Sequence, residues 1–138
     1  MKLLMIVYVS AISFLGCKDH PRLSPDCKQQ VIIDKDRYLQ TPSDEFSIFK
    51  ATLKNDCLLL TVRYSGGCGT TDWKLIDSGE RLGQVPVQRN IRLTLKDEDP
   101  CEAYLAKELS FDLSPLKVKG ENKISISLEG WDKKLIYE

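Results

Sequence analysis

Histidine is almost absent from this sequence: the 138 residues contain one, His20. His20 lies next to Pro21 and close to Pro25, in a stretch whose prolines and few apolar residues predict a tether rather than a packed element. A Cys–His pair or a Ser–His–Asp triad therefore has no base within the folded domain. The commonest metal ligand is missing there too. We expect a protein that is not an enzyme, with no catalytic residue, no metal ligand and no cofactor.

The sequence also lacks a surplus of charge of either sign, because 20 Lys and Arg residues balance 20 Asp and Glu residues. Nucleic acids and anionic membrane surfaces select for a basic surplus, so we expect no nucleic-acid partner. The sequence contains no internal repeat, no low-complexity tract and no second linker. Its length fits one domain with a modest core, which benefits from disulfides.

The N-terminus has the pattern of an export signal. A short basic start at Lys2 precedes the uncharged, mostly apolar run Leu3–Leu15, which is shorter than the about 20 apolar residues that a membrane-spanning helix needs. The segment Phe14-Leu15-Gly16-Cys17 resembles a bacterial lipobox, although Phe14 replaces the usual Leu. We expect residues 1–16 to be removed, Cys17 to be lipidated and residues 17–27 to form the tether. The alternative is an ordinary cleaved signal that leaves Cys17 as a thiol.

The number of cysteines agrees with a lipid anchor. Five is an odd number, and lipidation of Cys17 leaves an even set for disulfides in an oxidising compartment: Cys27, Cys57, Cys68 and Cys101. We therefore expect the lipid bilayer to be a partner through the Cys17 acyl chain. The expected location is the bacterial cell envelope, at the outer membrane, facing either the periplasm or the cell surface.

The dominant periodicity is two, the period of β-strands. Short alternating runs bounded by turn residues predict strands at 46–53, 57–65, 73–77, 88–96, 109–113 and 124–128. In the first strand, Phe49 is predicted to share the apolar face of Ala51 and Leu53. The segment 101–107 is interpreted as a strand that leads into 109–113, with a helical turn as the alternative. Residues 28–138 are thus predicted to form an all-β fold, a small disulfide-stabilised antiparallel β-sandwich, immunoglobulin-like or related.

The alternating direction of successive strands predicts which cysteines pair. Cys57 opens one strand, and Cys68 follows the opposite end of that strand. Cys101 follows the strand 88–96, which ends on the same side as Cys68. Because a disulfide requires Cα atoms within about 7 Å, Cys57 is disfavoured as a partner of either. The predicted bonds are Cys27–Cys57 and Cys68–Cys101.

Three features are candidates for function. The loop glycines Gly66, Gly67 and Gly69 permit an anion-binding nest, but a tight loop that reaches a disulfide partner is the favoured interpretation. The acidic loop Asp97–Glu102 has a calcium site as its alternative interpretation, whereas a solvated turn is favoured. Trp131 has the sequence setting of an exposed turn residue.

Three segments, Val62–Gly69, Asp99–Tyr104 and Leu109–Leu116, contain the motifs GGC, DPCEA and FDLSPL. Together they resemble a group of small uncharacterised bacterial lipoproteins. That group has a histidine shortly after the first cysteine motif, where this sequence has Thr71 and Asp72. The resemblance supports the disulfide framework and implies no activity.

The expected function is a non-catalytic binding or structural module that displays its loops to a protein or glycan ligand. The alternative is a small metal-dependent or carboxylate-based hydrolase that uses the acidic loop.

Overall fold

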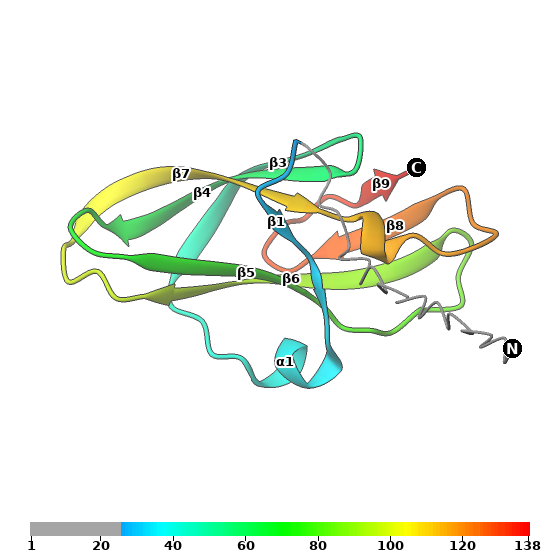
Figure 1. The fold of residues 1–138 in the computed structure, drawn as a ribbon, viewed down its shortest axis with the longest axis horizontal. Helices are drawn as coiled ribbons and strands as arrows, with labels where there is room; N and C mark the ends of the chain where they lie inside the picture. The colour runs from blue at the N-terminus through cyan, green and yellow to red at the C-terminus, as the bar shows by residue number, and fades with distance from the viewer. Residues whose placement is uncertain (1–25) are drawn as a thin grey trace, which may run out of the picture.

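The computed structural model describes residues 26–138, and these form a two-layer β-sandwich (Figure 1). One sheet has four strands in the order β1-β7-β4-β3: β1 (Gln29–Gln30), β7 (Ala103–Asp112), β4 (Cys57–Gly66) and β3 (Phe46–Lys54). The other sheet has five strands in the order β2-β5-β6-β8-β9: β2 (Ile32–Ile33), β5 (Thr71–Asp77), β6 (Val87–Asp97), β8 (Ile124–Leu128) and β9 (Leu135–Tyr137). The predicted disulfide-stabilised all-β sandwich is confirmed.

The predictions for the export signal, for Cys17 and for most of the tether fall on residues outside the described range. Between residues 26 and 138, no helix combines the length and the apolar character needed to cross a membrane.

The sheets are mixed, so the prediction of purely antiparallel pairing was wrong in part. The pairs β1–β7, β2–β5 and β6–β8 are parallel. The third pair follows from the chain path, because β7 ends on the side of the sandwich where β6 begins. A short 3₁₀ turn, Ser114–Leu116, then carries the chain to the other sheet, and β8 enters beside β6 in the same direction. Strand 101–107 was correctly predicted as extended, since β7 begins at Ala103.

Phe49 does not share the face of Ala51 and Leu53, as its place in the alternation predicted. The register of β3 against β4 shifts between Ile48 and Lys50, so one extra residue is inserted in β3. A bulge of this kind changes the face to which the following side chains point. Ile48 and Ala51 pack inward on either side of the bulge, and the Phe49 side chain is 60% exposed on the outer face.

The core lies between the two sheets and is filled by the inward side chains of every long strand. Its largest fully buried members are Phe111, Leu58, Leu60, Leu75, Ile91, Leu95, Leu113, Leu116, Ile126, Leu128 and Val62. Trp73 contacts Phe46 and Tyr64 edge-to-face, with ring centroids 5.3 and 5.6 Å apart. Trp131, predicted as an exposed turn residue, is instead half-buried against this core.

A short helix that the sequence pattern did not predict, α1 (Lys35–Gln40), covers the outer side of the five-stranded sheet (Figure 1). Asp34 begins it by accepting a hydrogen bond from the Arg37 backbone N–H at 2.9 Å. Arg92 ends it, because its Nη1 donates to the carbonyl oxygens of Tyr38 and Thr41 at 3.1 and 2.9 Å. A cation is also favourable at the carbonyl end of a helix because that end carries partial negative charge.

Candidate functional site

The two disulfides join the cysteines in the predicted pairs. Cys27 is bonded to Cys57, and Cys68 is bonded to Cys101, with a Cα–Cα distance of 5.7 Å in each pair. The second bond links the β4–β5 loop to the β6–β7 loop, and both loops cross between the sheets at the same end of the sandwich. The chain direction of the strands was therefore sufficient to select the pairing.

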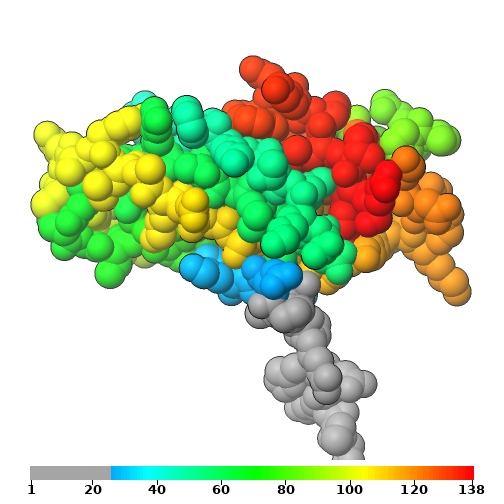
Figure 2. All heavy atoms as spheres, turned by 90° about the horizontal axis from the view of Figure 1, so that it is seen from above, coloured from blue at the N-terminus to red at the C-terminus, as the bar shows by residue number. Residues whose placement is uncertain are grey.

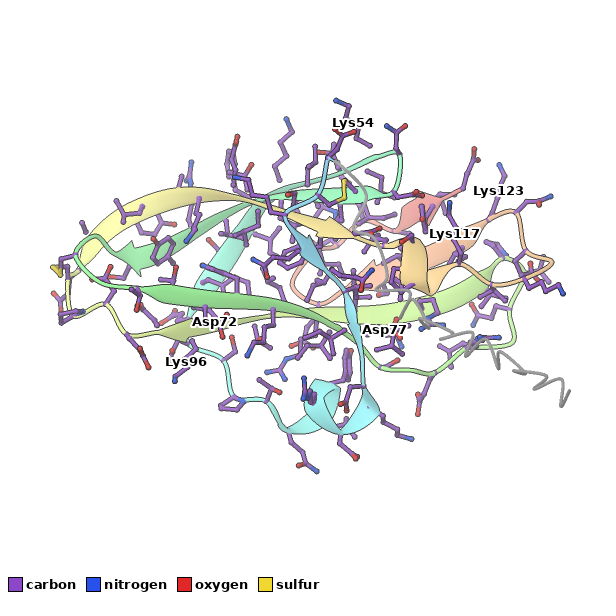
Figure 3. All side chains as sticks on the ribbon, viewed as in Figure 1. Lys54, Asp72, Asp77, Lys96, Lys117 and Lys123 are labelled. Atoms are coloured by element: carbon purple, nitrogen blue, oxygen red, sulfur yellow. A yellow bond between two sulfur atoms is a disulfide. The ribbon has the colours of Figure 1, made fainter. Side chains whose placement is uncertain are left out.

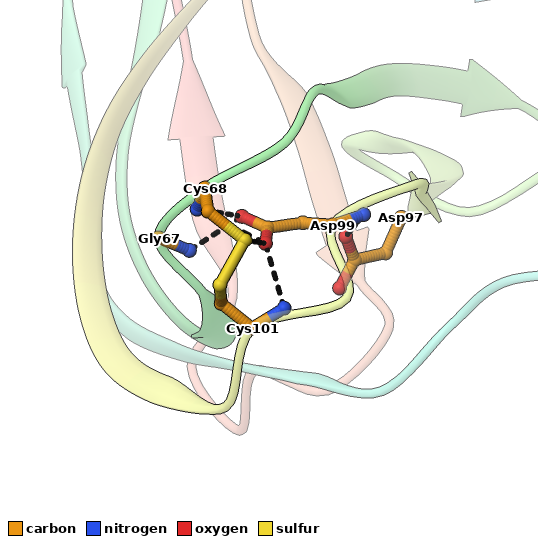
Figure 4. The surroundings of a disulfide bond; sticks show 5 residues. All are labelled: Gly67, Cys68, Asp97, Asp99 and Cys101. Atoms are coloured by element: carbon orange, nitrogen blue, oxygen red, sulfur yellow. Dashed lines mark hydrogen bonds between the residues drawn. A yellow bond between two sulfur atoms is a disulfide. The ribbon is translucent and has the colours of Figure 1, made fainter.

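The carboxylate of Asp99 lies inside the glycine-rich β4–β5 loop, beside this disulfide (Figure 4). Its two oxygens accept hydrogen bonds from the backbone N–H groups of Gly67 and Cys68, and Oδ1 accepts a further one from Cys101 at 3.0 Å. Oδ1 also lies 3.2 Å from the Cys68 sulfur. The loop is thus the anion-binding nest that the glycines suggested, and the anion that it holds belongs to the chain itself.

Two of the glycines are needed for this arrangement. Gly67 has a φ of +127°, which an L side chain rarely adopts. A Cβ on Gly69 would lie 2.6 Å from the Asp99 Cα and 2.7 Å from the Glu98 carbonyl oxygen, which are backbone atoms and have no freedom to move aside. Tight loop geometry and anion binding, treated as alternatives from the sequence, are therefore two aspects of one structure.

The nest stabilises the ionised form of Asp99. Partial desolvation of the carboxyl group opposes ionisation, but hydrogen bonds from the backbone of Cys101, Gly67, Cys68 and Gly69 outweigh it and lower the pKa of Asp99 from 3.8 to about 2. Because the folded-state pKa lies below the ordinary value, Asp99 stabilises the fold above about pH 4. This contribution is lost as the pH falls from about 4 to about 2.

Replacing Asp99 with asparagine should therefore lower the urea midpoint of unfolding at pH 7, because the amide presents one acceptor oxygen and a repelling NH₂ group to the nest. The difference between variant and wild type should narrow at pH 2.5, where the wild-type carboxylate is partly protonated. Glu98→Gln is the matched control in the same loop, since the Glu98 carboxylate pairs with the exposed Lys96 at 2.9 Å and takes no part in the nest. An Asp99→Asn midpoint equal to that of Glu98→Gln at pH 7 would contradict this role.

Two other acidic residues of the loop Asp97–Glu102 also have partners: Asp97 binds within the loop, and Glu98 pairs with Lys96. Asp97 Oδ1 accepts a hydrogen bond from the Asp99 backbone N–H at 2.8 Å. The Cys68 and Cys101 sulfurs and an Asp99 oxygen lie within 4.8 Å of one another, a spacing that metal ligands can have. Both sulfurs are joined in the disulfide, however, and metal coordination requires thiolates.

A buried ion pair that the sequence did not predict lies toward the other end of the sandwich. The guanidinium of Arg89 in β6 makes two hydrogen bonds to the carboxylate of Asp77, the last residue of β5, and the side chains are 4% and 0% exposed. Asp77 Oδ1 also accepts a hydrogen bond from the Gly79 backbone N–H at 2.7 Å. Figure 3 labels Asp77 and, near the start of the same strand, Asp72 on the outer side of the sheet. The bidentate geometry and the full burial indicate a structural role.

Figure 2 shows the outer face of the four-stranded sheet, over β7, β4 and β3. Exposed aromatic side chains lie around an arginine on this sheet. The Arg63 guanidinium carbon lies 4.2 Å from the ring centroid of Phe49 and 6.0 Å from that of Tyr104. A shallow hollow of about 250 Å³ on the same face is lined by Lys28, Lys50, Thr52, Thr61, Glu108 and Ser110 among others. The alternation pattern missed this surface because it placed Phe49 in the core.

Comparison with known proteins reveals the fold and no family. No protein-family model matches the chain, and no curated protein matches it. Solved structures with a similar fold include a NigD-like immunity protein from Bacteroides caccae, with 14% identity and a TM-score of 0.58 over 80% of this chain. A protein of unknown function from Bacteroides vulgatus (13%, 0.55) and a toxin-related protein from Parabacteroides distasonis (18%, 0.54) each match over 80% of this chain. This chain spans 58%, 56% and 59% of their lengths, in that order.

Proposed function

We propose that this chain is a non-catalytic binding module, anchored by lipid in the bacterial cell envelope. The observation that carries the proposal is that the groups a reactive site would use are bound within the fold. Cys68 and Cys101 form a disulfide, and the Asp99 carboxylate is held by backbone N–H groups. The rigid sandwich that these bonds create is suited to the display of a surface to a ligand.

The structural neighbours support a protein as that ligand in preference to a glycan. One of them is described as an immunity protein and another as toxin-related, although the identities of 14% and 18% establish only a common fold. The cell-envelope location follows from the lipobox-like segment ending in Cys17 and from the group of bacterial lipoproteins that the sequence resembles.

The lipid anchor is tested by replacing Cys17 with serine. Of the five cysteines, the four in the described range are paired with one another, which leaves Cys17 for modification. We expect the variant to lose all incorporation of radioactive fatty acid and to remain as a precursor, or to be released as a soluble protein by another peptidase. Equal labelling of wild type and variant would rule out lipidation at Cys17.

The absence of a metal-dependent activity is tested by a calcium titration monitored by the melting temperature. Because Asp97 and Asp99 already accept hydrogen bonds from their own loop, we expect calcium to shift the melting temperature by less than about 2 °C, the change that a weakly bound ion produces. Magnesium at the same ionic strength is the control. A large, saturable increase with calcium alone would instead favour the hydrolase that uses the acidic loop.

A further inference from the structure

We infer that the outer face of the four-stranded sheet is a docking surface for an acidic segment of a protein partner. The inference rests on the proposed binding function and names the surface and the partner chemistry. Its centre is the cation–aromatic patch, defined as Arg63, Phe49 and Tyr104. A carboxylate of the partner binds the Arg63 guanidinium, and apolar groups beside that carboxylate cover the two rings.

The patch is built by neighbouring strands. Arg63 points outward from β4, where its cross-strand neighbours are the small residues Ser47 and Ala106. The bulge in β3 brings Phe49 to one side of the guanidinium, and Tyr104 of β7 lies on the other. Phe49 and Tyr104 are 60% and 69% exposed, which is unusual for rings of this size. Arginine and aromatic residues are the types most enriched where binding energy concentrates in protein interfaces.

Arg63 and Arg81 differ from the other arginines among residues 26–138, because neither pairs with a carboxylate. Arg37, Arg89 and Arg92 each pair with a carboxylate. Arg63 has no such partner among residues 26–138, and its contacts there are with the aromatic rings. No carboxylate among residues 26–138 pairs with the N–H groups at the edge of this guanidinium, whose carbon lies 4.2 Å from the Phe49 ring centroid. That edge has the geometry to bind one carboxylate with two hydrogen bonds.

The charges beside the patch favour an acidic partner. The neighbouring hollow contributes Lys28 and Lys50, against Asp26 and Glu108. Together with Arg63, the charged residues that line this hollow are three cations against two anions, although the chain as a whole is neutral. A face of this sign attracts an acidic surface and orients it during encounter.

A protein fits the patch better than a glycan does. A sugar ring stacks on the open face of an aromatic side chain, whereas here Arg63 lies over the Phe49 ring at 4.2 Å. An arginine beside two exposed rings, with lysine and threonine nearby, is instead the composition of a protein interface, in which aromatic residues and arginine are enriched.

Site-specific photocrosslinking of the full chain in intact cells tests the inference. The photoreactive amino acid benzoylphenylalanine replaces Tyr104 in one strain and Lys74 in another, because Lys74 lies on the outer face of the other sheet with its side chain 50% exposed. We expect a protein adduct from position 104 and none from position 74, with aspartate or glutamate residues in the crosslinked peptide. Adding Arg63→Gln should reduce the adduct at position 104 at least about tenfold, the effect typical of a central interface arginine.

Lys74→Gln is the matched control for the loss of one positive charge, and it should leave the adduct unchanged. Melting temperatures within a few degrees of wild type establish that both variants are folded. Three results would contradict the docking surface but not the binding function: adducts at position 74 only, an adduct with a carbohydrate, or an adduct at position 104 that Arg63→Gln does not reduce. The absence of any adduct at either position would overturn the proposed function as well.

Discussion

Replacing Arg89 with methionine should lower the free energy of unfolding by about 3–5 kcal/mol, because it leaves the Asp77 carboxylate buried without its cation. The Arg89 and Asp77 side chains are 4% and 0% exposed, so water has no access to replace the lost hydrogen bonds. A loss of this size is a large part of the total stability of a small domain, which is about 5–15 kcal/mol. Urea unfolding of the purified variant at pH 7, compared with wild type, measures this loss.

Control variants distinguish the effect of losing the buried ion pair from the effect of losing an exposed one. Lys35→Met breaks the Lys35–Glu80 pair, whose side chains are 62% and 50% exposed, and should have little effect on the free energy of unfolding. The double variant Asp77→Leu/Arg89→Met removes both charges and should recover part of the loss, since an apolar pair can replace a buried ion pair. Recovery should be incomplete, because Asp77 also accepts the Gly79 N–H. A cost of Arg89→Met no greater than that of Lys35→Met would show that the buried pair is not needed for stability.

Replacing both Cys68 and Cys101 with serine should lower the free energy of unfolding by about 3–4 kcal/mol. The bond spans 33 residues, and breaking it gives the unfolded chain the entropy of an open loop of that length. The hydrogen bonds from the Gly67 and Cys68 backbone N–H groups to Asp99 also join these two loops, so we expect the double variant to fold. Urea unfolding under oxidising conditions measures the loss.

The single variant Cys68→Ser is informative beside the double one, because it leaves Cys101 as a free thiol. We expect mixed disulfides and a lower yield from the single variant and a cleaner, less stable product from the double one. The Cys27–Cys57 bond closes a similar loop of 30 residues, so replacing both of these cysteines with serine should lower the free energy of unfolding by a comparable amount. Mass spectrometry of an unreduced digest checks the pairing, and a Cys57–Cys68 peptide would contradict it.

The long strands were predictable because their alternation reflects burial on one face, which is a local property of the sequence. Strand β4 illustrates this: Leu58, Leu60 and Val62 are buried where the period of two placed them. The two-residue strands β1 and β2 leave no such pattern, and they pair with strands far away in the sequence. Helix α1 has a clear N-cap in Asp34, but six residues are too few for a helical periodicity to emerge.

The candidate sites likewise include features that the local sequence predicts and features that depend on how distant residues come together. Spacing and strand direction predicted the disulfides. From the glycines a tight loop was favoured and a nest was the alternative, and the anion in the nest is Asp99, a residue 32 positions from Gly67. The patch around Arg63 depended on a bulge, and one inserted residue reverses which side chains are exposed without altering the composition. Arg89 and Asp77 were hidden because each is an ordinary charged residue until the sheet register aligns them in the interior.

The Cys27–Cys57 bond has a mechanical consequence for a protein held by its N-terminus. The two-residue strand β1 would be peeled away easily by a pulling force applied before Gln29, because few hydrogen bonds hold it. The bond to Cys57 transfers that force instead to the start of β4, which pairs with β3 on one side and β7 on the other. Tension on the N-terminal segment therefore reaches a central strand with a neighbour on each side, instead of a two-residue strand at the edge of the sheet.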